Sequence, residues 1–258
     1  MNFYDKTKEE RRKVVEQINS EIFSGIKRNI NSEIISYFSH EDTYIRKSAY
    51  LAIGKIYAST SSEKVLKKKI ISQLNKLLKE KDFKIRQTVI NAAGEIGIKE
   101  FELVESFFDR ALFDPHHSVR NAVIGSIKKM GEKNPKSVLK WAKKYLHHSD
   151  KEVRREICHG IELRGRKYPQ DILPMLHQLE FDKTARVSNT LVHVLGQIAY
   201  KKGCLVTVIK HLNKWKNKEL VEKAIDEIID VHDRYKNFSV LTQDEAVRYI
   251  EKHLRMKK

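Results

Sequence analysis

Two short sets of side chains in the second half of the chain could bind phosphates or bases. Within each set the residues follow one another at intervals of three or four, which places them on one face of a helix. The sets are Arg155, His159, Glu162 and Arg166, then Asn189, His193 and Gln197. Arginine, asparagine, glutamine and histidine bind phosphate oxygens and base edges. The pattern predicts two polar lines for contact with nucleic acid, and an ordinary solvated helix surface is the alternative.

Positive charge is concentrated beside these sets. The chain has 258 residues, with 51 Lys and Arg against 34 Asp and Glu, and a formal net charge of +17. Between residues 116 and 170 there are 14 Lys or Arg and only 5 Asp or Glu, and four lysines within 64–69 form a second group. Because neutralising phosphates releases condensed counterions, a concentrated basic surface favours nucleic acid as the partner. We therefore add Lys128 and Lys167 to the predicted DNA-binding residues, and acidic protein partners remain an alternative.

The elements that must position these side chains repeat along the chain. In most copies an acidic turn residue precedes a β-branched residue, an arginine and a helix rich in small residues. The arginines are Arg46, Arg86, Arg120, Arg154 and Arg186, separated by 40, 34, 34 and 32 residues. A period of this length indicates a stacked repeat array. Because the acid and the arginine recur once in every copy, we interpret them as structural contacts rather than functional residues.

Each copy contains two helical segments. Apolar residues recur three and four apart in both, for example at Leu74 and Leu77 in a first segment and at Val153 and Ile157 in a second. Capping boxes begin at Thr7 and at Thr242, and Asn134-Pro135 is typical of a helix start. One helix pair cannot bury its apolar face alone, but five or six stacked pairs can. The pattern predicts an all-α protein.

The pattern Asp…(Val/Ile)-Arg…Ala…Gly over residues 32–235 resembles the HEAT-repeat (armadillo-like) family. The resemblance implies an all-α, right-handed HEAT-repeat solenoid of five to six antiparallel helix pairs. In that family the second helices line an inner, concave face, and the repeated Asp and Arg form a ladder between repeats. We expect a single domain, 1–258, with an N-terminal capping helix in 1–30 and a C-terminal one in 239–258.

Several classes of function lack their usual motifs. The chain has no glycine-rich nucleotide-binding loop, no HExxH, no GxSxG and no CxxC. Cys158 and Cys204 are too few for a disulfide framework, no apolar run approaches the roughly 18 residues of a membrane span, and no histidine or cysteine pairs have zinc-finger spacing. We expect a cytoplasmic or nucleoid-associated monomer with no metal, no cofactor and no membrane contact.

A second resemblance concerns the stretch from Asp150 to Tyr200. Its Val153-Arg154-Arg155, Gly160, Pro169 and the Leu-rich helix 172–179 are similar to the bacterial HEAT-like DNA alkylation-repair glycosylases. The resemblance implies duplex DNA in a concave basic groove, where carboxylates stabilise the positive charge that develops as a cationic base is removed. His159 and Gln197 stand where one branch of that family carries Glu and Asp. Glu162 and Glu95 are then the candidate catalytic carboxylates, and the alternative for Glu162 is an ion pair with Arg155 or Arg166.

Three functions follow from these observations. The leading prediction is a protein that grips the duplex-DNA backbone in a concave basic groove and is associated with DNA repair. The second is an enzyme, a DNA glycosylase that excises an alkylated or otherwise modified base. The third is a non-catalytic protein-interaction scaffold. The sequence leaves open whether the chain is an enzyme.

Overall fold

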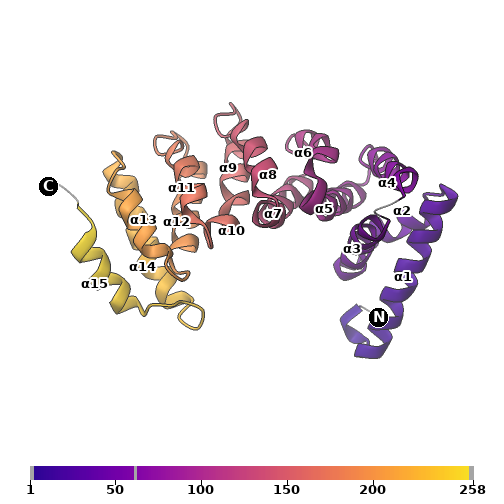
Figure 1. The fold of residues 1–258 in the computed structure, drawn as a ribbon, viewed down its shortest axis with the longest axis horizontal. Helices are drawn as coiled ribbons and strands as arrows, with labels where there is room; N and C mark the ends of the chain where they lie inside the picture. The colour runs from indigo at the N-terminus through magenta and orange to yellow at the C-terminus, as the bar shows by residue number, and fades with distance from the viewer. Residues whose placement is uncertain (1–2, 61–62, 256–258) are drawn as a thin grey trace. The chain divides into compact units, whose positions relative to one another are not determined.

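The computed structural model describes residues 3–60 and 63–255, and over these residues it contains helices and turns but no strand (Figure 1). The all-α prediction is confirmed. The chain divides into two compact units, 1–134 and 135–258, which are described separately below. That the whole chain forms one domain stays a prediction. Every helix in the described residues is too short or too polar to cross a bilayer.

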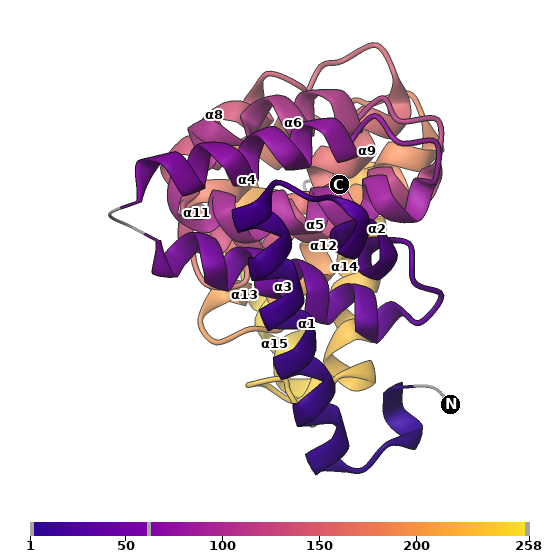
Figure 2. The same cartoon turned by 90° about the vertical axis from the view of Figure 1, so that its right-hand side faces the viewer.

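The first unit stacks its helices in two layers. It contains η1 (Phe3–Asp5), α1 (Lys8–Arg28), α2 (Ser32–Phe38), α3 (Thr43–Ser59), α4 (Lys64–Leu77), α5 (Phe83–Glu100), η2 (Phe101–Leu103), α6 (Glu105–Ala111) and α7 (His117–Lys133). Helices α1, α3, α5 and α7 pack in that order (Figure 1), and α4 and α6 each pack against α5 (Figure 2). Helices α5 and α7 approach closely because Gly94 has no side chain: a Cβ there would lie 2.6 Å from Ser126 Oγ.

The second unit repeats this arrangement. It contains α8 (Pro135–Lys143), α9 (Lys151–Gly160), α10 (Glu162–Gly165), α11 (Pro169–His177), α12 (Ala185–Ala199), α13 (Cys204–Leu212), α14 (Lys218–Arg234) and α15 (Gln243–His253). Helices α9, α12 and α14 are successive neighbours in one layer, and α11 and α13 pack together in the other. The inner helices are held by buried aliphatic residues at helical spacing, such as Val187, Leu191 and Val194 on α12.

The helix starts follow the sequence signals. Capping boxes are present at Thr7 with Glu10 before α1 and at Thr242 with Glu245 before α15. Helix α8 begins at Pro135, as predicted from the missing N–H of proline. The end helices α1 and α15 lie within the segments 1–30 and 239–258 that were expected to cap the array.

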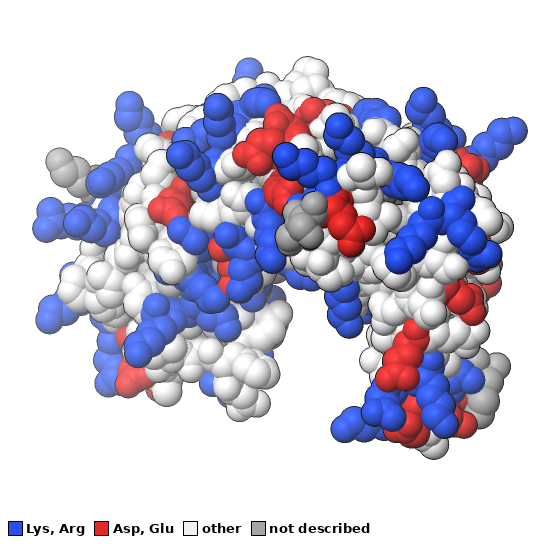
Figure 3. All heavy atoms as spheres, turned by 45° about the vertical axis from the view of Figure 1, so that its right-hand side comes forward, with Lys and Arg blue, Asp and Glu red and all other residues white. Residues whose placement is uncertain are grey.

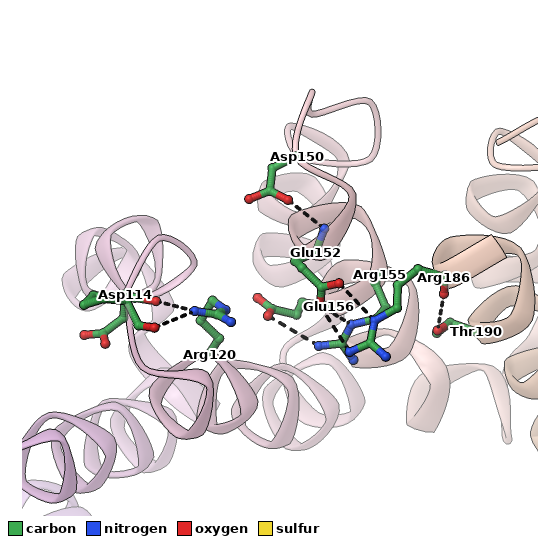
Figure 4. A network of polar contacts seen from close by, with 9 residues as sticks. Asp114, Arg120, Asp150, Glu152, Arg155, Glu156, Arg186 and Thr190 are labelled. Atoms are coloured by element: carbon green, nitrogen blue, oxygen red, sulfur yellow. Dashed lines mark hydrogen bonds and ion pairs between the residues drawn. The ribbon is translucent and has the colours of Figure 1, made fainter. Parts of the chain in front are cut away.

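The repeated Asp and Arg form a ladder inside each unit. Arg86 donates two hydrogen bonds to Asp114, at 2.7 and 3.0 Å, and Arg154 makes the same two-pronged contact with Asp182. Each arginine also donates to carbonyl oxygens of its own turn. The structural interpretation of these residues is confirmed for both pairs. Asp150 caps α9 by accepting from the Glu152 N–H at 2.8 Å (Figure 4).

Candidate functional sites

The first predicted polar line begins on α9, where Arg155 is held by carboxylates. Arg155 Nε lies 2.8 Å from Glu152 and its Nη2 lies 3.5 Å from the buried Glu156 (Figure 4). Glu152 is shared with Arg186 of α12, at 2.9 Å. Burial pushes the pKa of Glu152 up, but hydrogen bonds from Arg186 and Arg155 outweigh it and lower that pKa. Because the carboxylate stays ionised, the charge of Arg155 is neutralised within the protein.

The line continues at Glu162, the first residue of α10, whose side chain is only 1% exposed. Glu162 accepts a short hydrogen bond from Arg166, and its Oε2 lies 3.3 Å from His159 Nε2. Arg166 also donates to the buried Gln197 Oε1 at 2.7 Å and to Tyr200 Oη at 3.3 Å. The structure therefore bears out the interpretation of Glu162 as an ion-pair partner of Arg166. Gln197 supports the same pair rather than facing solvent.

The second polar line meets the first at His193. The rings of His159 and His193 lie edge to face with their centroids 5.7 Å apart, and His193 Nδ1 lies 3.5 Å from Glu227 Oε1 on α14. Helices α12 and α14 come this close because residue 196 is glycine: a Cβ there would lie 2.6 Å from Glu227 Cγ. One ligand atom from each of His159, Glu162 and His193 lies within 4.8 Å of the others. We call His159, Glu162, Arg166, His193, Gln197 and Glu227 the inner cluster.

The inner cluster also sets the protonation of its histidine. Burial, with the neighbouring His159, lowers the pKa of His193 in spite of the opposing attraction of Glu162 and Glu227. His193 is therefore a neutral imidazole at physiological pH, with a lone pair on one ring nitrogen. A neutral imidazole neutralises no phosphate charge, but it can donate or accept a hydrogen bond or bind a metal ion.

The remaining predicted residues are not part of this cluster. Lys167 and Asn189 are exposed in the second unit. Lys128 on α7 and Glu95 on α5 belong to the first unit, and the inner cluster forms without them. Glu95 makes a short ion pair with Lys129, and its side chain is only 14% exposed. Both carboxylates proposed for catalysis, Glu162 and Glu95, are thus paired with a basic side chain.

The exposed positive charge lies mainly on other helices. In the second unit Lys136, Lys140 and Lys143 are exposed on α8, whose opposite side buries Val138 and Trp141. Figure 3 shows Lys and Arg outnumbering Asp and Glu on the face that it presents. Helix α8 thus carries three of the 14 Lys and Arg that the sequence places within 116–170. The inner line, by contrast, pairs its arginines with carboxylates.

The first unit carries a groove of about 860 Å³ beside α4. We call it the lysine groove, because six basic side chains line it: Lys64, Lys67, Lys68, Lys76, Lys79 and Arg110. Glu100 is the one carboxylate among the lining residues that the structure describes. Lys67 pairs with it at 2.5 Å and lies over the Tyr57 ring, and Tyr57 Oη donates to it at 2.8 Å. The hydrogen bond from Lys67 lowers the pKa of Glu100 against the effect of burial, so one lysine is neutralised and the other cations dominate the groove.

The fold resembles known helical-repeat structures. AlkD2 from Streptococcus mutans superposes with a TM-score of 0.55 at 14% identity, over 79% of this chain and 97% of that one. A TOG domain of crescerin, which uses an array of such domains to regulate microtubules in the primary cilium, superposes with a TM-score of 0.50 at 17% identity, over 81% and 88%. The chain is a HEAT-like helical-repeat solenoid. No protein-family model and no curated protein matches its sequence, and at these identities the likeness concerns the fold alone.

Sequence reasoning missed two contributions to these sites within the solenoid. His159, His193 and Glu227 are each 34 residues apart, the repeat period, so they occupy equivalent positions on successive inner helices. That period was the available signal for Glu227. The lysine groove also needs Tyr57 from the preceding helix, and Glu100 and Arg110, which lie far from the lysine run of α4 in the sequence. No local motif connects them.

Proposed function

We propose that the protein binds nucleic acid, and specifically the phosphate backbone of duplex DNA, through its exposed lysines. The observation that carries the proposal is the lysine groove, where six cations line one surface and a single carboxylate is already paired with Lys67. A strand of phosphates presents negative charge at regular intervals, and releasing its counterions favours binding to such a surface. The contacts are to the backbone, so we expect weak sequence preference and a strong salt dependence.

The ion pairs of Arg155 and Arg166 support this choice of surface. Arg155 and Arg166 already have carboxylate partners, two of which, Glu156 and Glu162, are buried. Moving a guanidinium from a buried carboxylate to a phosphate would leave an unpaired charge in the protein, which is costly. Of the predicted residues, Lys167 and Asn189 are exposed at the surface of the second unit. We place the main DNA contacts on the lysine groove. Arg155, Arg166 and Gln197 instead make ion pairs and hydrogen bonds within the protein.

The same geometry argues against base excision. Stabilising a positive charge on a sugar requires a carboxylate that faces the substrate. Glu162 is buried under Arg166, and Glu95 is paired with Lys129. We therefore propose DNA binding without glycosylase chemistry. If the protein does not bind DNA, a protein-interaction scaffold becomes the leading function.

The test compares two charge-reversal variants of the full chain. One carries Lys64→Glu, Lys68→Glu and Lys76→Glu in the lysine groove. The matched control carries Lys202→Glu, Lys210→Glu and Lys214→Glu, three lysines of the second unit that are also exposed. Affinity for a fluorescent duplex is measured by anisotropy across a salt series, and each lost phosphate contact reduces the log–log salt slope by about 1.

The outcomes separate the three functions. We expect the groove variant to lose most of its affinity and about three units of slope, while the control changes much less. An equal loss of affinity in both variants would show that binding depends on net charge alone, and would contradict the lysine groove as the binding surface. Absence of DNA binding at low salt would leave the protein-interaction scaffold as the remaining function. Strand breaks after the bound alkylated duplex is heated in alkali would establish a glycosylase.

A further inference from the structure

Three residues of the inner cluster, His159, Glu162 and His193, lie together although no sequence motif predicts it. His159 lies in the last turn of α9, Glu162 is the first residue of α10 and His193 lies on α12. The grouping therefore depends on two neighbouring repeats. Their ligand atoms lie within 4.8 Å of one another, and His159 Nε2 is 3.3 Å from Glu162 Oε2. We propose that these three side chains bind a divalent transition-metal ion, with zinc as the best match. Nucleic-acid binding is neither required by this proposal nor excluded by it.

The donor types fit zinc. Two imidazoles and one carboxylate are a set that Zn²⁺ uses when three protein ligands leave a fourth position for water. With bonds of about 2.1 Å, tetrahedral donors lie about 3.4 Å apart, which is close to the His159–Glu162 distance in the protein. The ligand atom of His193 lies within 4.8 Å of the other two, so a small approach completes the set. The side chain of His193 is 42% exposed and that of His159 is 29% exposed, so small rotations of both rings meet little resistance from packing.

The surroundings of the three ligands suit a metal site. Arg166 holds Glu162 through Oε1, which leaves Oε2 on the histidine side of the carboxylate. Glu227 lies 3.5 Å from His193 Nδ1, the position in which a carboxylate orients a ligating histidine through its other ring nitrogen. Glu162 is therefore oriented towards the histidines by Arg166, and Glu227 is placed to orient His193.

The experiment titrates the metal-stripped full chain with Zn²⁺ alone, by calorimetry and by competition with a chromophoric chelator. Co²⁺ provides a second readout, because its visible absorption reports tetrahedral coordination by nitrogen and oxygen. The ligand variants are His159→Gln and His193→Gln, and the outer variant is Glu227→Gln. The matched control is His147→Gln, since His147 is an exposed histidine of the same unit that contacts Gln178 rather than a carboxylate.

We expect one ion per chain, affinity lowered at least about 100-fold by either ligand variant and about 10–100-fold by Glu227→Gln, and no change in the control. The Co²⁺ spectrum should disappear with either ligand variant. Absence of saturable binding would overturn the proposal. Binding that survives both ligand variants, or that is lost equally in the control, would also overturn it. Because both histidines are partly exposed, these variants should fold even if Glu162→Gln does not.

Discussion

The ladder contact between Arg154 and Asp182 allows a quantitative prediction for Asp182→Asn. Asp182 accepts two hydrogen bonds from Arg154 and two from Thr184, through the backbone N–H and the hydroxyl, at 2.9 and 2.7 Å. Asparagine has nearly the same shape and can still accept from Thr184. The substitution therefore removes the charge opposite Arg154 and replaces one of the two oxygens that accept from it with an NH2 group.

The magnitude follows from burial. The side chains are 14% exposed for Arg154 and 6% for Asp182, so the pair resembles a buried ion pair more than a surface one. Removing one partner of a buried pair costs about 3 kcal/mol, whereas an exposed pair contributes about 0–1 kcal/mol. We expect the free energy of unfolding to fall by about 3 kcal/mol and the melting temperature by roughly 6 °C. The matched control is Lys223→Ala, because the Lys223–Glu219 pair is 56% and 77% exposed and should matter little.

The effect should also depend on pH in a defined direction. Burial tends to raise the pKa of Asp182, but the hydrogen bonds from Arg154 and Thr184 prevail and hold it below its ordinary value of 3.8. A lowered pKa in the folded state stabilises the fold above the unfolded value, and this stabilisation is lost as pH falls through the folded pKa. The difference between the wild type and Asp182→Asn should be full at pH 7 and shrink below about pH 3.8.

Urea denaturation followed by circular dichroism, at pH 7 and at a series of lower values, measures both quantities. A stability of Asp182→Asn equal to that of the wild type at pH 7 would refute the ladder as a source of stability. A loss of the same size at every pH would show that the charge is not its cause. If Lys223→Ala lowers the stability as much as Asp182→Asn does, burial does not decide how much an ion pair contributes.

Two further predictions concern helix packing and helix ends. Gly94→Ala should destabilise the fold by about 1–3 kcal/mol, because the added Cβ would lie 2.6 Å from Ser126 Oγ, whereas Gly125→Ala has nothing within 4 Å and should stabilise α7 by up to about 1 kcal/mol. Equal effects in the same urea assay would contradict the close approach of α5 and α7. Thr242→Ala should cost about 1 kcal/mol through loss of the capping box of α15, and hydrogen exchange should show faster opening of its first turn; unchanged exchange there would speak against the box.

The repeat could be predicted because its signals are local and recur, and the resemblance to HEAT repeats implied the ladder. An acid that caps a helix and an arginine four residues later interact with the backbone of their own turn, so each copy carries the same pattern in the sequence. Arg154 illustrates this, since it donates to the carbonyls of His148 and Ser149 in its own turn before it reaches Asp182. The capping boxes at Thr7 and Thr242 are local in the same way.

The partners of the polar side chains could not be predicted from helical spacing alone. Spacing places Arg166 and Glu162 on one face, and it correctly allowed their ion pair, but it also predicted Gln197 to be a DNA contact. In the structure Gln197 is buried and accepts from Arg166, because α12 packs against α9 and α10. Which polar residue faces water depends on the neighbouring repeat.

The sequence by itself determined the all-α repeat, the helix starts and the excess of positive charge, and its resemblance to HEAT repeats implied the Asp–Arg ladder. The helix starts follow from propensity and capping, which act over a few residues, and the repeat follows from periodicity. Only the tertiary structure decided that the inner arginines are neutralised by Glu152, Glu156 and Glu162, and that the lysine groove needs Tyr57, Glu100 and Arg110. It alone brought His159, Glu162 and His193 together. The reason is that ion pairing and ligand geometry depend on distances between helices, and close packing at residues such as Gly196 sets those distances.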